Sequence, residues 1–356
     1  DILVIMNESW ADLSCAGDFE TNIPYNEFYT NLTENTIKGT ACVSIYGGNT
    51  PQSEYEFLTG NTISFLPSGA IAYNLYIKKD TPSLVSQLSE QGYECIAMHP
   101  EKATNFNRNQ VYPRLGFLQF LTEDDFTDVV KIRELCSDQS VYDKMIDLYE
   151  NKKEGQKLFL YGVTMQNHGG YTYEGEDFTP LVQTVGLNKT YDKVNQYLTC
   201  MRYTDEALEN LIGYFSDVDE HVMIVMFGDH HGDVGSDFYE ELYGKKLIDV
   251  EGEQYETRYE TPFFIWTNYE IEEKADEKIS LNYLSTLAMQ TANIPLTEYQ
   301  SFLAELQSHY PVISAAGIYD AEGNFYTWNN VEESADYSYM KEYQILEYYM
   351  LENYKK

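Results

Sequence analysis

Positive charge is scarce in this sequence. The 356 residues include 23 Lys and Arg but 58 Asp and Glu, which gives a formal net charge of −35 at pH 7. No cluster of basic residues interrupts this excess, so a nucleic acid backbone would be repelled and we expect no nucleic-acid partner. The same field repels anionic substrates. A site for a phosphate ester must therefore supply its own cations, as a metal or as a few placed side chains.

Long apolar runs and regular cysteine spacings are also missing. No run approaches the roughly 20 apolar residues that cross a bilayer, and no signal peptide is present. The five cysteines are scattered without a C-x-x-C spacing, which predicts mostly buried thiols and no disulfide framework. Because the sequence starts without Met at a strand pattern, we interpret it as an excised or mature domain whose membrane anchor would lie upstream.

The composition that is present suits a large globular domain. Hydrophobic residues make up 43% of the chain, which is enough for a core and excludes global disorder. Tyrosine is abundant, at 33 residues. Many of these tyrosines stand in polar contexts, which we interpret as an exposed surface that faces carbohydrate or cell envelope.

Four short apolar runs predict strands buried in a parallel sheet: residues 2–6, 94–98, 157–164 and 222–227. Helices are predicted between most of them, at 83–91, about 140–151 and about 188–216. Right-handed crossovers would bring the carboxyl ends of all four strands to one edge of one sheet, where open α/β sheets bind their ligands.

Each of these strands is followed by a side chain that can bind a metal or a phosphate: Glu8, His99, His168 and the pair Asp229-His230. A carboxylate beside an imidazole suits a divalent cation such as Mn²⁺ or Zn²⁺, although a solvated Asp-His turn explains the pair equally well by itself. The recurrence of the pattern favours a site, because the chain has only six histidines. We interpret His221 and His309 as structural and leave His231 open.

The segment 46–62 predicts a capped helix. A Gly-Gly-Asn turn leads to Thr50 at the N-cap and Pro51 at the first helical position, and the helix ends near Gly60. A capping role explains Thr50 fully. A nucleophilic hydroxyl at a helix N-terminus needs the same geometry, and a metal beside it would lower its pKa, so the sequence pattern leaves both roles open.

Beyond residue 260 the sequence predicts a strand at 262–267, a helix at 281–292, a hairpin at 319–326 and a Tyr-rich terminal helix. The fold class is therefore α/β: a mostly parallel central sheet with helices on both faces and a small C-terminal α+β subdomain. We place the catalytic domain at 1–300 and the C-terminal subdomain at 301–356.

Several motifs occur in an order that resembles one known family. They are Gly48-Asn49-Thr50, His99 followed by Phe106-Asn107-Arg108, Tyr112 and Leu115-Gly116-Phe117, then Thr164 with Asn167-His168, then Gly228-Asp229-His230, and finally Phe302-Leu303, Leu306 and Tyr310-Pro311-Val312. This pattern is similar to the extracellular catalytic domain of lipoteichoic acid synthases and related phosphoglycerol transferases, in the alkaline phosphatase/sulfatase superfamily. The resemblance spans nearly the whole chain and implies the superfamily's fold.

The resemblance implies a role for each matched residue. Thr50 would be the nucleophile, and Glu8, Asp229 and His230 with the Thr50 hydroxyl would hold one divalent metal, with Mn²⁺ first and Mg²⁺ or Zn²⁺ as alternatives. Contacts to the glycerophosphate group would come from His99, Arg108 and His168, with Phe106 beside them.

The implied activity is transfer of glycerophosphate from phosphatidylglycerol, through a phospho-threonine, to a glycerol-phosphate polymer or a glycan hydroxyl. It would take place on the extracellular face of the bacterial cell membrane, to which an upstream anchor would tether the domain.

Two departures bear on head-group specificity. Phe106 stands where the family often has Trp, and Val234 replaces a small hydroxyl residue after the metal His.

A sulfatase fits poorly, because its formylglycine position requires Cys or Ser with Pro at +2 and Arg at +4, whereas Gln52 and Glu54 follow Thr50 here. A phosphoethanolamine transferase, a phosphodiesterase and a catalytically silent ectodomain that binds an envelope polymer remain alternatives.

Overall fold

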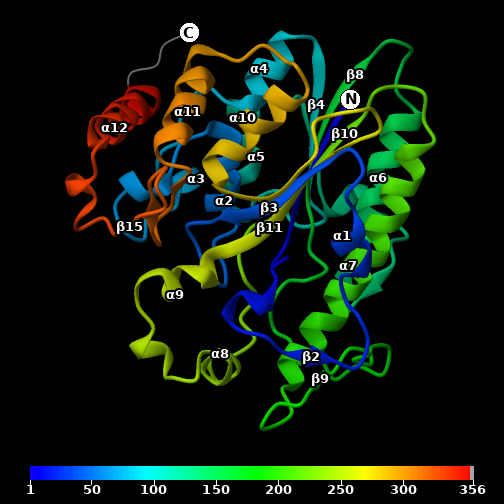
Figure 1. The fold of residues 1–356 in the computed structure, drawn as a ribbon. Coiled ribbons are helices and arrows are strands. Elements are labelled where there is room, and N and C mark those ends of the chain that lie inside the picture. Colours follow the sequence, from blue (N-terminus) through cyan, green and yellow to red (C-terminus); the bar gives the residue numbers. More distant parts are fainter. Residues whose placement is uncertain (353–356) are drawn as a thin grey trace.

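An eight-stranded sheet runs through the centre of the computed structural model, which describes residues 1–352 (Figure 1). In spatial order its strands are β12 (Lys274–Ser280), β3 (Thr36–Cys42), β11 (Glu260–Thr267), β10 (Met223–Gly228), β1 (Ile2–Asn7), β8 (Lys157–Val163), β4 (Tyr93–Met98) and β5 (Gln119–Leu121). The five strands from β10 to β5 are parallel, and β11 is antiparallel to both of its neighbours. The predicted fold class, a mostly parallel sheet, is confirmed.

The four strands predicted from apolar runs lie side by side as β10, β1, β8 and β4. Every residue of β1 and β10 is buried, as expected for strands covered on both faces. Their register pairs Asn7 with Gly228, so the loops after the two strands leave the sheet at the same level. The prediction that the four carboxyl ends share one edge is therefore confirmed.

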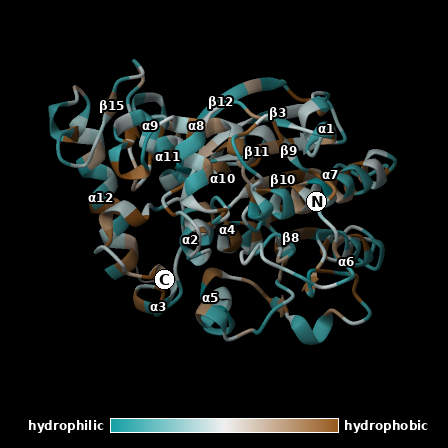
Figure 2. Ribbon diagram, turned by 90° about the horizontal axis from the view of Figure 1, so that it is seen from below, coloured by the Kyte–Doolittle hydropathy of each residue, from teal (hydrophilic) through white to brown (hydrophobic). Residues whose placement is uncertain are grey.

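Two hydrophobic clusters cover the two faces of the sheet. Residues of β1 alternate between them: Ile2, Val4 and Met6 belong to one cluster, while Leu3 and Ile5 belong to the other. The first cluster receives side chains from α2, α4, α5, α10, α11 and α12, and the second from α6, α7 and α8. Figure 2 shows hydrophobic residues in the strands between these layers and hydrophilic residues in the outer turns.

The helices are α1 (Glu27–Asn31), α2 (Pro51–Thr59), α3 (Ala72–Leu75), α4 (Leu84–Glu90), α5 (Arg108–Leu115), α6 (Asp138–Glu150), α7 (Asp192–Ser216), α8 (Ser236–Tyr243), α9 (Gly252–Glu256), α10 (Leu281–Thr291), α11 (Glu298–His309) and α12 (Tyr337–Glu352). Small sheets pair β2 (Glu20–Thr21) with β9 (Thr184–Val185) and β6 (Lys131–Ile132) with β7 (Leu135–Cys136). Helices α4, α6, α7 and α10 lie where the sequence predicts them. The sequence analysis missed β3 and β12, whose charged or Gly-containing sequences carry no apolar run.

The C-terminal region adds a three-stranded antiparallel sheet of β13 (Val312–Ile313), β14 (Ile318–Tyr319) and β15 (Phe325–Tyr326), which includes the predicted hairpin. Residue 300, the predicted boundary, falls within α11. Side chains on both sides of it, such as Leu284 and Leu306, belong to the same hydrophobic cluster. The division into two parts stays a prediction.

Tyrosine corrects one of the expectations. Apart from Arg108, the largest fully buried side chains are eleven tyrosines. Much of the tyrosine therefore lies in the core and not on an exposed surface that faces carbohydrate or cell envelope. The rings of these tyrosines bury large apolar areas, and all their hydroxyls except that of Tyr283 find hydrogen-bond partners within residues 1–352. The polar sequence context of these residues does not reveal such burial. The cysteines behave as expected: all five are free, and all but Cys15 are buried. Within residues 1–352, no helix has both the length and the apolar composition needed to span a bilayer.

Gly228, the last residue of β10, approaches the backbone of the loop after β1 very closely. A Cβ atom on Gly228 would lie 1.8 Å from the carbonyl oxygen of Trp10. We expect Gly228→Ala to lower the free energy of unfolding by at least about 3 kcal/mol, because a backbone atom must move to admit the methyl group.

Chemical denaturation of Gly228→Ala and Gly213→Ala measures this effect. Gly213 lies on the exposed side of α7, and a methyl group added there would have no atom within 4 Å, so its substitution should stabilise the helix by roughly 1 kcal/mol. Equal stability of Gly228→Ala and wild type would contradict the close approach.

Glu347 of α12 is a buried carboxyl that joins the terminal helix to α2. Its oxygens accept hydrogen bonds from the Tyr55 hydroxyl (3.1 Å) and the Thr62 backbone N–H (2.9 Å). Burial raises the pKa of Glu347 from 4.5 to about 8. A carboxyl with a raised pKa in the folded state contributes its full stability below the unfolded pKa and loses it as the pH rises through the folded value.

We therefore expect Glu347→Gln, which stays neutral, to gain thermal stability relative to wild type as the pH rises from about 5 to about 8, by a few degrees in Tm. Differential scanning calorimetry at several pH values measures this difference. The control is Glu342→Gln on the exposed side of the same helix, for which the difference from wild type should be independent of pH. A constant difference for Glu347→Gln would contradict the raised pKa.

Candidate metal and nucleophile site

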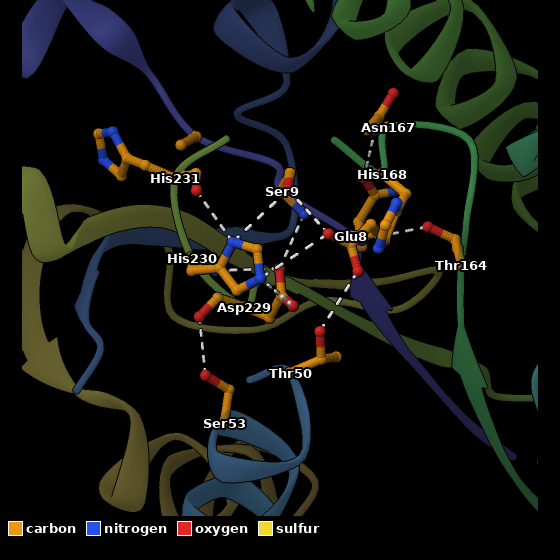
Figure 3. Close-up of polar contacts among 12 residues, drawn as sticks. Glu8, Ser9, Thr50, Ser53, Thr164, Asn167, His168, Asp229, His230 and His231 are labelled. Atoms are coloured by element: carbon orange, nitrogen blue, oxygen red, sulfur yellow. Dashed lines mark hydrogen bonds and ion pairs between the residues drawn. The ribbon is translucent and has the colours of Figure 1, made fainter. Parts of the chain in front are cut away.

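Glu8 and Asp229 leave the sheet next to each other, at the ends of β1 and β10, and His230 follows Asp229. One ligand atom from each of these three residues lies within 4.8 Å of the other two, and all three side chains are buried. Figure 3 shows the three side chains converging on one point. The sheet register therefore brings together the residues that the sequence analysis assigned to the metal.

Hydrogen bonds orient the ligand atoms. Asp229 Oδ1 accepts from the backbone N–H groups of Ser9 (2.8 Å) and His230 (2.9 Å), which leaves Oδ2 free. The Nδ1 of His230 lies 2.9 Å from the carbonyl oxygen of His231. A carbonyl oxygen only accepts, so Nδ1 carries the proton and Nε2 points at the carboxylates, 3.2 Å from Asp229 Oδ2.

The ligand atoms without hydrogen-bond partners show whether a metal would fit this site. Asp229 Oδ2 and His230 Nε2 are buried and have no hydrogen-bond donor or acceptor partner among residues 1–352. Burial and the Glu8 charge raise the pKa of Asp229 to about 7, and although burial alone lowers the pKa of His230, the two carboxylates raise it. Two carboxylates and one imidazole with unused lone pairs match a divalent cation such as Mn²⁺ or Zn²⁺.

Thr50 is the residue before α2, as predicted, but its side chain makes no capping hydrogen bond. The hydroxyl instead lies 3.4 Å from Glu8 Oε2, at the edge of the carboxylate cluster. A capping role therefore does not account for Thr50 in this structure. The hydroxyl stands at the N-terminus of a helix, where unpaired N–H groups and the helix dipole favour negative charge.

Three hydroxyl residues whose roles the sequence analysis missed fix this arrangement. Ser53, one turn into α2, donates to the carbonyl oxygen of Asp229 at 2.7 Å and so ties the helix to the end of β10. Thr164, after β8, accepts a hydrogen bond from the backbone N–H of Glu8 at 3.2 Å. Ser9 donates to Glu8 Oε1 at 2.7 Å. No spacing rule in the sequence identifies such contacts between distant segments.

A buried polar network lies beneath the cluster. Asn7 donates to Asp138 Oδ2 (2.8 Å) and accepts from Asn167 (2.8 Å), and Thr204 of α7 donates to the same Asp138 oxygen at 2.7 Å. Burial raises the pKa of Asp138, while the bonds from Asn7 and Thr204 oppose that rise. The network joins the ends of β1 and β8 to α6 and α7, so it supports the loops that carry Glu8 and His168.

His99 lies at the end of β4, as predicted, and is buried. Its Nδ1 is 3.0 Å from the carbonyl oxygen of Val163, so Nδ1 is protonated and Nε2 is an acceptor. Burial and, next, the Arg108 charge lower the pKa of His99, which keeps the imidazole neutral. His99 can therefore accept a proton or a hydrogen bond from a hydroxyl.

Arg108 is the first residue of α5. Its side chain is fully buried and pairs with Glu54. Its Nε donates to Glu54 Oε1 at 2.9 Å, and Nη2 forms an ion pair with the same oxygen. Tyr112 and Tyr73 donate to the other Glu54 oxygen at 2.7 and 3.1 Å. Among residues 1–352, Nη1 is the guanidinium nitrogen that forms no hydrogen bond. The sequence analysis weighed Glu54 only as the wrong residue for a sulfatase, yet it stands four positions after Thr50 on the same helix face.

Phe106 and His168 are more exposed to solvent than His99 and Arg108. Phe106 is 36% exposed, has a left-handed backbone (φ 53°) and lies 5.4 Å from the Arg108 guanidinium. His168 is exposed in the loop after β8, and its charge contributes to the lowered pKa of His99. Figure 3 shows His168 beside Glu8, whereas no hydrogen bond or ion pair among residues 1–352 joins His99, Arg108 or Phe106 to the carboxylate cluster. The roles of these residues stay predictions.

The remaining histidines lie away from the ligand atoms. His231, which the sequence left open, is buried between the Tyr239 hydroxyl (3.1 Å) and the Glu260 carbonyl oxygen (2.7 Å), and burial lowers its pKa to about 4. His309 pairs with Asp336 at 2.8 Å, and His221 stacks on Tyr269. Val234 packs in the second hydrophobic cluster.

The match to known proteins extends over most of the chain. The family model described as Sulfatase matches residues 1–294. The chain belongs to the Sulfatase family. A Rhizobium meliloti protein assigned to cyclic beta-1,2-glucan modification is 28% identical over 323 residues, which cover 88% of this chain and 49% of that protein. Lipoteichoic acid synthase 1 of Bacillus subtilis is 26% identical and covers 58% of this chain and 32% of its own length. This Sulfatase-family chain thus spans about half or less of these relatives.

Solved structures of the same fold include two transferases. The Streptococcus pyogenes phosphoglycerol transferase GacH, in complex with sn-glycerol-1-phosphate, matches with a TM-score of 0.77 at 22% identity and covers 98% of this chain and 85% of its own. The lipoteichoic acid synthase LtaP of Listeria monocytogenes matches with a TM-score of 0.68 at 18% identity, covering 98% and 91%. The expected family resemblance is confirmed.

Removal of one ligand should abolish tight metal binding. We expect Asp229→Asn to weaken Mn²⁺ binding by at least about 100-fold, since Oδ2 is a free ligand atom and an amide is a poorer donor. Isothermal titration with Mn²⁺, Mg²⁺ and Zn²⁺ measures this and identifies the preferred ion. Asp233→Asn is the matched control, because Asp233 lies exposed in the same loop. Unchanged affinity in Asp229→Asn would place the metal elsewhere.

Proposed function

We propose that this protein is a metal-dependent phosphoglycerol transferase that moves glycerophosphate from phosphatidylglycerol to an acceptor hydroxyl through a phospho-threonine. The observation that carries the proposal is the Thr50 hydroxyl, which is free of any capping bond and lies 3.4 Å from Glu8 within reach of the carboxylate cluster. A hydroxyl placed this way at a helix N-terminus is suited to attack a phosphate ester.

The relatives support the reaction class. GacH is a phosphoglycerol transferase and LtaP a lipoteichoic acid synthase, and both share this fold over nearly the whole chain. Phosphoethanolamine transferases share it too, with TM-scores of 0.51 to 0.56, so the fold leaves the head group open. The order of the motifs around Thr50, Arg108 and His168 favours glycerophosphate.

Glu8, Asp229 and His230 would hold the cation, with Thr50 Oγ completing the set. When bound, the metal lowers the pKa of the adjacent hydroxyl and neutralises charge on the phosphoryl oxygens. We infer Mn²⁺ as the resident ion because oxygen ligands dominate the set and one imidazole joins them; Mg²⁺ and Zn²⁺ are the alternatives.

In the first half of the reaction, Thr50 Oγ forms a bond to phosphorus while the bond from phosphorus to the diacylglycerol oxygen breaks. The proton lost by Thr50 is balanced by the one that diacylglycerol gains on leaving. The N-terminus of α2 and the Arg108 guanidinium would stabilise the negative charge that grows on the phosphoryl oxygens.

In the second half, an acceptor hydroxyl attacks phosphorus from the position that diacylglycerol vacated, and the bond to Thr50 breaks. His99 is neutral with Nε2 as an acceptor, so it is the group placed to take the acceptor's proton. His168 and Phe106, both exposed, would contact the glycerol group. The chemistry predicts ping-pong kinetics.

The same proposal sets the location and the partners. A phospholipid donor requires a catalytic domain held at a membrane surface, and we place it on the extracellular face of the bacterial membrane, tethered by a segment outside this sequence. The acceptor is a glycerol-phosphate polymer or a glycan hydroxyl.

Intact mass after incubation with phosphatidylglycerol and Mn²⁺ tests the proposal. We expect wild type to gain one glycerophosphoryl group, which Thr50→Ala and chelated protein do not gain, while Thr50→Ser retains a slower reaction because it keeps a hydroxyl. A metal-loaded wild type that gains no adduct would overturn the phosphatidylglycerol donor, and phosphatidylethanolamine in the same assay would then test the phosphoethanolamine alternative.

A further inference from the structure

A cavity of about 400 Å³ opens next to the nucleophile. Asn49 and Gln52, which flank Thr50 and Pro51, form one wall. The loop 63–71 between α2 and α3 forms a second wall, and Ala315 and Trp328 of the C-terminal region close the third. The C-terminal region therefore contributes directly to a pocket at the site.

The lining of this pocket is neutral. It consists of apolar side chains with three serines, one asparagine, one glutamine and one tryptophan, and it contains no charged residue. This is unusual in a chain with 23 Lys and Arg and 58 Asp and Glu. A pocket without a cation in a protein of net charge −35 offers no binding energy to a polyanion such as a glycerol-phosphate chain.

Two polar side chains of the pocket are free. The Asn49 amide and the Ser68 hydroxyl are exposed and have no hydrogen-bond partner among residues 1–352. Gln52, by contrast, is used internally: it donates to the Ala70 carbonyl at 2.7 Å and accepts from the Ala72 N–H at 2.8 Å. The pocket thus presents an amide and a hydroxyl on a loop that Gln52 holds in place.

Trp328 supplies a fixed aromatic wall. Its indole N–H donates to the Ser314 carbonyl oxygen at 2.9 Å, and its ring packs edge-to-face on Phe65 with centroids 5.5 Å apart. A sugar ring has an apolar C–H face that packs on an aromatic ring and an edge of hydroxyls that pair with amides and hydroxyls. The volume lies within the range of small-ligand pockets, and the mixture of groups matches a neutral sugar.

We propose that this pocket binds a neutral sugar residue of the acceptor glycan, and thereby holds the acceptor beside Thr50 for the second half of the reaction. The role as an acceptor subsite rests on the proposed function, whereas sugar binding itself does not. The proposal also selects between the two acceptor classes, because it favours a glycan hydroxyl over a glycerol-phosphate polymer.

Binding to the Thr50→Ala protein tests the pocket without any turnover. Isothermal titration would compare cyclic β-1,2-glucan, a neutral glycan, with a glycerol-phosphate oligomer and with short-chain phosphatidylglycerol. The same titrations are repeated after adding Ser68→Trp, which fills the pocket from an exposed position. The matched control is Ser308→Trp on the exposed side of α11, outside the pocket lining.

We expect the glucan to bind, Ser68→Trp to weaken it at least about tenfold, and Ser308→Trp to leave it unchanged. No glucan binding, or binding that Ser68→Trp leaves intact, would overturn the proposal. It would equally be overturned if Ser68→Trp removed binding of the glycerol-phosphate oligomer or the lipid in place of the glucan. Because Thr50→Ala forms no adduct, these outcomes are independent of the mass assay that tests the proposed function.

Discussion

The register between β1 and β10 is the constraint on which the site depends. Asn7 pairs with Gly228 across two parallel, fully buried strands, so the residues that follow the two strands leave the sheet at the same level. A shift by one residue would turn the alternating side chains of β1 toward the wrong hydrophobic clusters, and the core opposes such a shift. The core thus holds two carboxylates together, at a spacing that leaves their lone pairs available to a cation.

The Thr50 hydroxyl, the proposed nucleophile, is placed by a second constraint, the docking of α2 on this edge. The Ser53 hydroxyl binds the Asp229 carbonyl oxygen and fixes the first turn of the helix, and the preceding Thr50 then faces Glu8. Pro51 has no N–H to cap. The hydroxyl of Thr50 therefore points to Glu8 and makes no capping bond, although its position in the chain is that of a helix cap.

The buried positive charge of Arg108 is paired within the protein. The buried guanidinium of Arg108, near the site, is held by Glu54, whose other oxygen binds two tyrosine hydroxyls; this fixes the direction of the guanidinium and neutralises its charge. A buried pair of this kind is costly to break, because either partner alone would be an uncompensated charge. Under the proposed function, the net attraction for a phosphate would come mostly from a cation held by the carboxylate cluster and from the helix N-terminus.

The sequence by itself determined the four apolar strands and the polar residues that follow them, among them Glu8, Asp229 and His230, because buried parallel strands are recognisable as short apolar runs. The assignment of these three residues to a metal came from the family resemblance and stays a prediction. The sequence also marked Thr50 as a residue at a helix start. Only the tertiary structure decided that the Thr50 hydroxyl is uncapped, that His231 points away from the ligands, and that Glu54 holds Arg108. These depend on contacts between segments far apart in the chain, whose distances no local pattern encodes. The tyrosines illustrate the same limit, because a polar sequence context does not show whether a ring faces water or the core.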